Sequence, residues 1–178
     1  LFAEGSDHAA KFSTTAGGWT VATTALTTGL LVNAVTDGED IDAGKLAVVD
    51  LNVYAVLWNE DNNRVDIFRS TNQGTDWASW LASAATGSVK NAFSDFPDRN
   101  GDNGFGFVTE DGVYMVDVSA AAAQKIVDLP SHTENGRLAA VWRGDLYVST
   151  GGGQIYRIRY LGNGNYDVRA GGPSAFVG

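Results

Sequence analysis

The chain has 178 residues, and 44% of them are hydrophobic, which is enough to build the core of one ordinary domain. Twelve basic residues against 21 acidic ones give a net charge of −9, and no Lys/Arg cluster occurs, so nucleic acid is excluded as the expected partner. The absence of cysteine excludes disulfides, thiolate catalysis, zinc ribbons and iron–sulfur sites, and the two histidines leave little for a His-based metal site. No apolar run approaches the roughly 18 residues of a membrane span, so membrane insertion is not expected.

The composition also favours one class of fold. Glycine is abundant at 22 residues, proline is scarce at 3, and 16 Asp outnumber 5 Glu. Aspartate and glycine are typical of turns, so the chain is expected to be all-β with many tight connections. It begins at Leu1 without a signal-peptide pattern, and we expect a processed or trimmed piece of a longer protein.

Strand-like segments recur along the chain with turn signals between them. The expected strands are 19–26, 30–35, 46–49, 53–58, 64–69, 106–109, 113–118, 125–129, 138–142, 145–149, 154–160 and 166–169. The connectors are rich in Gly and Asn, which supply positive φ angles, and they lie at 59–63, 110–112, 143–144, 151–153 and 162–165. This rhythm predicts an up-and-down all-β protein. A short helix is the alternative at 118–126, which contains four alanines, and at 77–85.

An internal repeat links two parts of the first half of the chain. The segment 68–77 aligns with 12–19, and the tryptophan that ends each copy is followed ten positions later by a Thr-Gly pair. The later copy, Ser70-x-Asn72-x-Gly74-x-x-Trp77, resembles the Asp-box or BNR repeat, Ser-x-Asp-x-Gly-x-x-Trp, with Asn at the acidic position. The earlier copy is degenerate and keeps Ser13, Gly17 and Trp19.

The spacing of the box has a physical reason. The Ser hydroxyl and the Asn side chain can bond the amides of their own turn, and glycine permits a positive φ. In this family, the box is a structural turn between the third and fourth strands of a β-propeller blade, where its Trp caps the blade core. The resemblance covers residues 1–90 and implies a sialidase-like β-propeller, as a non-catalytic member or a fragment.

The implied architecture is a propeller of about four blades, or an arc of a larger one, with a β-sandwich or jelly roll as the alternative. Tyr54, Tyr114 and Tyr147 occupy similar motifs, and their mean spacing is close to the ~40–45 residues of a four-stranded blade. The expected blades are 1–35, 46–90, 104–130 and 137–170.

The densest polar segment is 95–104. Asp98, Asn100 and Asp102 hold positions 1, 3 and 5 of a calcium loop and resemble the loops of integrin-type propellers and dockerins. Asn103 replaces the loop glycine, and Thr109 stands where a bidentate Glu belongs, so a solvated turn between blades is the alternative. The acidic loop at 36–42 is expected to be a solvated turn.

An enzyme is not expected. Glycosidases need two carboxylates flanking one bond, and sialidases also use three arginines from different blades and a Tyr–Glu pair. Here Arg157 and Arg159 share one expected strand, and the five glutamates show no pairing. Trp80 and Trp142 are candidate sugar-stacking platforms, with a place in the blade core as the alternative.

The expected function is therefore a non-enzymatic structural or recognition module that contacts proteins or glycans. The expected setting is extracellular, at a cell surface or in a virion, as a homo-oligomer or part of a larger assembly. The alternatives are a fragment of a sialidase-type glycoside hydrolase, and a purely structural subunit of a tail, capsid or surface layer. Calcium is the one cofactor considered.

Overall fold

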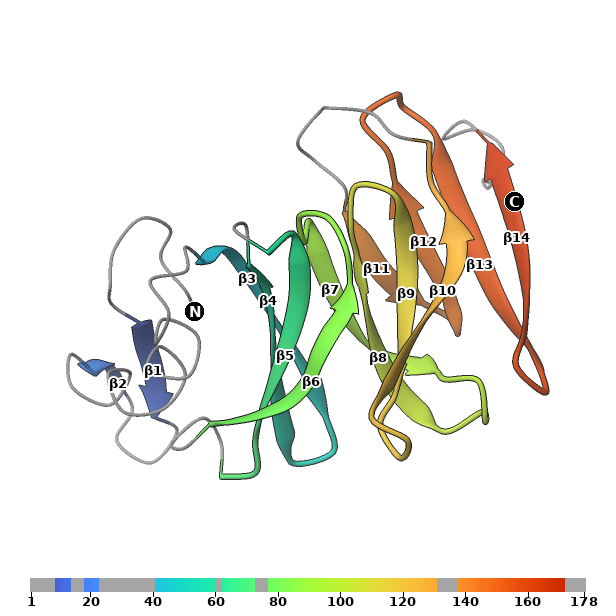
Figure 1. Ribbon diagram of the computed structural model, residues 1–178. Helices are drawn as coiled ribbons and strands as arrows, with labels where there is room; N and C mark the ends of the chain where they lie inside the picture. Colours follow the sequence, from blue (N-terminus) through green and yellow to red (C-terminus); the bar gives the residue numbers. More distant parts are fainter. Residues whose placement is uncertain are drawn as a thin grey trace.

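The computed structural model describes residues 9–13, 18–22, 41–59, 62–72, 77–130 and 138–171, and side chains from residue 44 onwards. Within these residues the chain is all-β, with fourteen strands and no helix. A two-stranded antiparallel sheet comes first, formed by β1 (Ala9–Ser13) and β2 (Gly18–Ala22). Three four-stranded antiparallel sheets follow, and none of them closes into a barrel (Figure 1).

The first four-stranded sheet is formed by consecutive strands in chain order. Its members are β3 (Ile41–Val49), β4 (Asn52–Asn59), β5 (Arg64–Ser70) and β6 (Ala78–Ala85). Strand β4 is apolar from Val53 to Trp58 and is buried along most of its length, whereas β5 alternates Val65 and Ile67 with the more polar Arg64 and Asp66.

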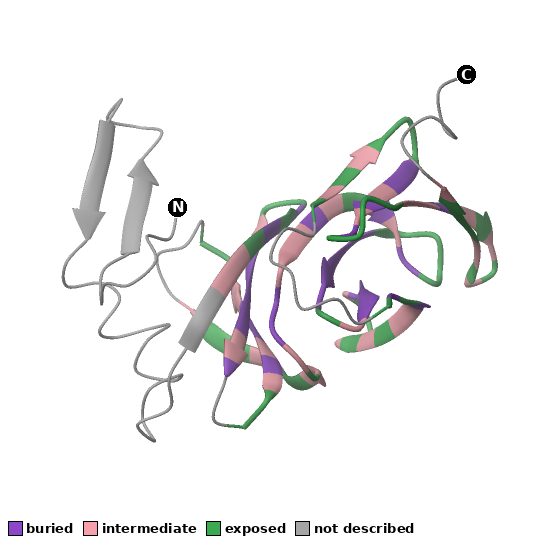
Figure 2. Ribbon diagram, turned by 90° about the horizontal axis from the view of Figure 1, so that it is seen from above, coloured by how far each residue is buried: buried purple, intermediate pink, exposed green. Residues whose placement is uncertain are grey.

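The second sheet repeats the same order with β7 (Asn91–Pro97), β8 (Asn103–Val108), β9 (Gly112–Asp117) and β10 (Ala122–Asp128). Every residue of β9 is buried. This strand has an almost continuous apolar sequence because both of its faces are covered. In the described part of the chain, buried residues are concentrated on the strands and exposed ones on the connections between them (Figure 2).

The third sheet consists of β11 (Ala139–Trp142), β12 (Asp145–Ser149), β13 (Ile155–Gly162) and β14 (Asn165–Gly171). Its hairpins turn through residues with positive φ, among them Arg143, Gly144 and Asn163. Polar and apolar side chains alternate along β12 and β13, so the two faces of this sheet differ strongly in character.

The three sheets stack side by side in chain order, and contacts between their first strands link them. β3 contacts β7, and β7 contacts β11; the fourth strands β6 and β10 also meet (Figure 1). Two apolar clusters fill the spaces between the sheets. One joins the first and second sheets around Tyr54, Ile67, Phe105 and Phe107, and the other joins the second and third sheets.

Most of the expected strands and hairpins within the described residues are confirmed. The two helix alternatives are wrong, since 78–85 and 122–128 are strands. Pairing of β10 with the buried strand β9 outweighs the helical propensity of its alanines. The expected strand 30–35 lies outside the described residues.

Strand β7 was missed by the sequence analysis, which assigned Asp95 to a polar loop. Asp95 has a φ of 60° and lies where the pairing of β7 with β8 shifts between Ser94 and Phe96. This β-bulge interrupts the alternation that marks a strand. As a result, the second sheet begins before the expected segment 104–130.

The same omission affected the three tyrosine motifs. Tyr54 and Tyr147 lie in the second strands of their sheets, β4 and β12, whereas Tyr114 lies in β9, the third strand of its sheet. The prediction that the three tyrosines occupy equivalent positions in their sheets was therefore wrong.

Candidate functional site

Two of the residues of the segment that resembles an Asp-box interact just after β5. The Ser70 hydroxyl donates a hydrogen bond to Asn72 Oδ1 at 2.9 Å and accepts one from the Asn72 amide at 3.4 Å. Ser70 is buried at the end of the third strand, and the half-buried Trp77 immediately precedes the fourth. Gly74 lies outside the described residues.

The degenerate copy begins in one strand of an antiparallel pair and ends in the other. Ser13 ends β1, Trp19 lies in β2, and Phe12 pairs with Trp19. Gly17 lies outside the described residues. In both copies the serine ends one strand, and the tryptophan lies at or just before the start of the antiparallel strand that pairs with it.

The turn between β7 and β8 contains the three residues considered for calcium. Asp98 is almost fully buried, and its Oδ1 accepts hydrogen bonds from the amides of Asn100 and Asp102, at 2.8 and 3.1 Å. The Asn100 side-chain amide donates to Asp117 Oδ2 at the end of β9, at 2.8 Å.

These contacts are typical of a turn that caps its own backbone amides. Among the residues that the structure describes, no group of three or more His, Cys, Asp or Glu side chains could hold a metal ion. The turn lies within one sheet, between its first and second strands, and calcium binding by Asp98, Asn100 and Asp102 stays a prediction.

The two candidate stacking tryptophans have different surroundings. Trp80 packs against the first apolar cluster, with its ring 5.1 Å from that of Tyr54 and 6.3 Å from that of Phe105. Trp142 is 58% exposed at the end of β11, and its ring lies 6.2 Å from that of Tyr147. Of the two, Trp142 is the one open to a partner.

Trp142 belongs to the face of the third sheet that points away from the second sheet. Leu146, Val148 and Ile158 pack toward the second sheet, so alternation places their neighbours along β12 and β13 on the opposite face. We call this opposite surface the arginine face. It comprises Trp142, Asp145, Tyr147, Arg157, Arg159, Asp167 and Arg169.

The strongest ion pair on the arginine face joins β12 to β13. Arg159 donates two hydrogen bonds to Asp145, from Nε to Oδ1 at 2.7 Å and from Nη2 to Oδ2 at 2.8 Å. The Asp145 side chain is only 8% exposed. Hydrogen bonding from Arg159 holds the pKa of the Asp145 carboxyl below its ordinary value.

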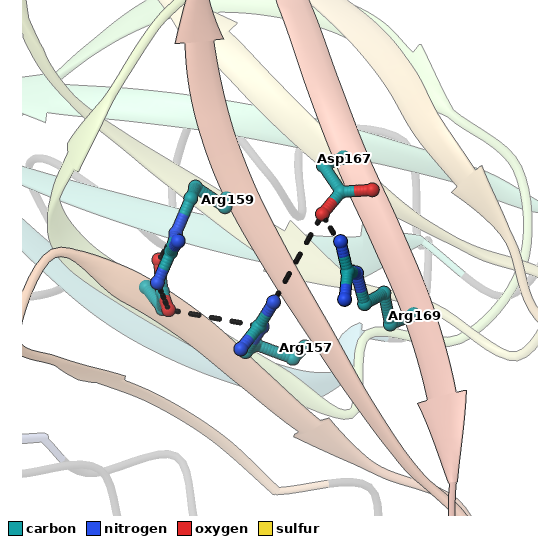
Figure 3. A network of polar contacts seen from close by, with 5 residues as sticks. Arg157, Arg159, Asp167 and Arg169 are labelled. Carbon is teal, nitrogen blue, oxygen red and sulfur yellow. Dashed lines mark hydrogen bonds and ion pairs between the residues drawn. The ribbon is translucent and has the colours of Figure 1, made fainter. Parts of the chain in front are cut away.

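Arg157 is less well partnered than its neighbours. It lies 3.8 Å from Asp145 Oδ2 and 3.9 Å from Asp167 Oδ2, which is too far for a hydrogen bond (Figure 3). Its Nε is buried without a hydrogen-bond partner. Asp167 is already bound by Arg169 Nε at 3.0 Å. Sequence analysis noted that Arg157 and Arg159 share a strand, but it did not place Asp145 beside them.

The carboxylate of Asp117, at the end of β9, is also engaged in structural contacts. Asp117 accepts hydrogen bonds from the Ser119 hydroxyl and the Ala120 amide, and these contacts, that of Ser119 above all, lower its pKa. A glycosidase acid instead requires a raised pKa. Neither Asp117 nor Asp145 has the properties of such an acid. His8, His132, Glu4, Glu39, Glu60 and Glu134 lie outside the described residues.

No family model matches this chain, and no curated protein matches it in sequence. The described residues contain no helix that is long and apolar enough to span a membrane.

Proposed function

We propose that this chain is part of an Asp-box β-propeller and serves as a non-catalytic structural or recognition module. The observation that carries the proposal is the threefold recurrence of a four-stranded sheet, in chain order, with contacts between successive first strands. A propeller is built by such radial repetition, whereas sandwiches and jelly rolls use Greek-key connections.

The position of the Asp-box motif supports the same proposal. Ser70 ends the third strand of its sheet and Trp77 precedes the fourth, which is where the resembling family carries its box. The degenerate copy likewise begins in one strand, at Ser13, and ends in the strand that pairs with it.

A non-catalytic role is supported by the state of the carboxylates. Asp145 is bound by Arg159, and the side chain of Asp117 caps a turn and accepts a hydrogen bond from Asn100. A panel of fluorogenic glycosides, sialosides included, tests this point. We expect no turnover by the folded chain, and turnover would establish the glycoside hydrolase alternative instead.

The proposed setting is a secreted, surface or virion assembly, in which the module contacts other protein subunits or glycans. Support comes from the acidic, cysteine-free composition, which suits an exposed protein. Mass measurement and a glycan array separate the roles: regular particles favour a structural subunit, and selective retention of a glycan favours recognition. On the glycan array, a loss of retention by Trp142→Ala would show that the exposed ring contacts the glycan. Trp80→Ala is instead expected to destabilise the core.

A further inference from the structure

We propose that the arginine face is a docking surface for an acidic polypeptide segment of a partner protein. This inference rests on the proposed recognition role and adds to it the place and the chemistry of the partner.

The register places two arginines directly opposite each other. Arg157 in β13 pairs with Arg169 in β14, while Tyr147 occupies the neighbouring position in β12. Like charges directly opposite on one face of a sheet destabilise it. The adjacent row alternates in sign, from Asp145 through Arg159 to Asp167.

The two aspartates do not neutralise the three arginines. Asp145 is held by Arg159 at 2.7 Å, and Asp167 is held by Arg169 at 3.0 Å. Arg157 remains beyond hydrogen-bond distance of both, with its side chain 20% exposed. One cation is therefore in excess on this face, although the chain as a whole carries a net charge of −9. A carboxylate seated beside Arg157 and Arg169 would remove this excess.

The aromatic residues favour a polypeptide over a polysaccharide. The Arg143 guanidinium lies 4.5 Å from the ring centroid of Trp142, so one face of the indole is already covered and cannot stack on a sugar. Trp, Tyr and Arg together are the residues enriched at the centres of protein–protein interfaces. The arginine face also differs from the two interfaces between sheets, which are filled by clusters of buried aliphatic and aromatic side chains.

Binding of fluorescein-labelled hexaglutamate, followed by fluorescence polarisation at low and physiological salt, tests the proposal. We expect saturable binding that Arg157→Gln and the more exposed Arg169→Gln each weaken about tenfold, the effect of losing about 1.4 kcal/mol. Trp142→Ala is expected to weaken it as well. The matched control is Arg99→Gln, because Arg99 is exposed in the turn between β7 and β8 and carries the same charge. Thermal melting of each variant checks that it is folded.

Each contrary result overturns the proposal. Absence of binding by the folded chain excludes an acidic polypeptide as the partner. Equal weakening by Arg99→Gln shows that hexaglutamate is held by non-specific electrostatic attraction and not at the arginine face. Stronger binding of oligogalacturonate than of hexaglutamate assigns the face to an acidic polysaccharide. Sedimentation that reveals a dimer broken by Arg157→Gln assigns the face to a second copy of the chain. All of these outcomes leave the glycoside panel unaffected, so failure of the docking surface is distinguishable from failure of the proposed function.

Discussion

The hydroxyl group of Tyr166 donates a hydrogen bond to the backbone carbonyl oxygen of Pro97 at 3.1 Å, and this bond ties the last strand of the third sheet to the first strand of the second. Tyr160 makes a parallel contact, donating to the carbonyl oxygen of Arg99 at 3.2 Å. The Tyr166 ring also stacks on Phe96, with 6.1 Å between the centroids. The turn that contains Asp98 is therefore held against the neighbouring sheet.

Tyr166→Phe is expected to lower the free energy of unfolding by about 1 kcal/mol, since it removes the hydrogen bond and keeps the ring. Urea denaturation measures the change. Tyr166→Leu, which also removes the stacking on Phe96, should cost more. Equal stability of Tyr166→Phe and the original chain would show that the bond to Pro97 contributes nothing.

Asn72→Asp, which introduces the acidic residue that an Asp-box has at this position, is expected to raise the free energy of unfolding by roughly 0.5–1 kcal/mol. The Ser70 hydroxyl already donates to Asn72 Oδ1, and a charged acceptor makes such a bond about twice as strong. Asn72→Ala should lose about 1 kcal/mol. Thr71→Asp is the control, because it adds the same charge one position away. An equal increase in the free energy of unfolding for Thr71→Asp would show that the added charge, and not the bond to Ser70, is the cause.

Asp145 is expected to make the protein sensitive to acid. Its pKa is lowered in the folded state by Arg159, so its contribution to stability is present above the unfolded pKa of about 4 and is lost as the pH falls through the folded pKa. Asp145→Asn should lower stability at neutral pH and flatten its decline in acid. Urea midpoints measured from neutral pH to about pH 2 test this. Asp128→Asn is the control, since that side chain is 91% exposed, and its decline in acid should match that of the original chain.

Ala121→Gly is expected to stabilise the protein by about 1 kcal/mol. Ala121 has a φ of 49° in the turn before β10, a conformation that costs a non-glycine residue roughly 1–2 kcal/mol. Ala123→Gly, in the regular part of β10, should destabilise the protein by about 0.5–1 kcal/mol. Differential scanning calorimetry of both variants checks the opposite signs, and a loss in both would argue against strain at Ala121.

Gly106→Ala is expected to destabilise the second sheet by about 1–3 kcal/mol or more. A Cβ atom at this position would clash with the Tyr114 backbone oxygen and the Phe93 ring. Gly153→Ala serves as the comparison, because nothing lies within 4 Å of its added Cβ and its φ of +76° is the only source of strain. A melting temperature for Gly106→Ala at or above that of Gly153→Ala would contradict the steric argument.

The strands that sequence analysis located correctly have clear alternation or glycine-rich turns at their ends. β12 and β13, for example, follow connectors with Gly144 and Gly153, which have positive φ angles. β7 is missing from the expected strands because the bulge at Asp95 interrupts its pattern. The expected strand 125–129 covers only the second part of β10, because the alanines of the first part also suit a helix. Both strands are specified by pairing with neighbours, which local sequence does not display.

The arginine face is likewise indicated only in part by the sequence. Two residues of a strand that are separated by one other residue lie on the same face of the sheet, so the sequence alone places Arg157 and Arg159 together. It does not contain the register that sets Asp145 beside Arg159 and Arg169 opposite Arg157. Nor does it reveal that Trp80 is half-buried against the core while Trp142 is exposed.

The all-β class, the tight hairpins and the repeated serine–tryptophan motif follow from the sequence alone, because turn chemistry and side-chain alternation act over a few neighbouring residues. The tertiary structure alone decided which strands share a sheet, which faces of the sheets are buried and which charges meet. Those outcomes depend on register between segments far apart in the chain, and a shift of one residue would exchange the buried and exposed faces of a strand.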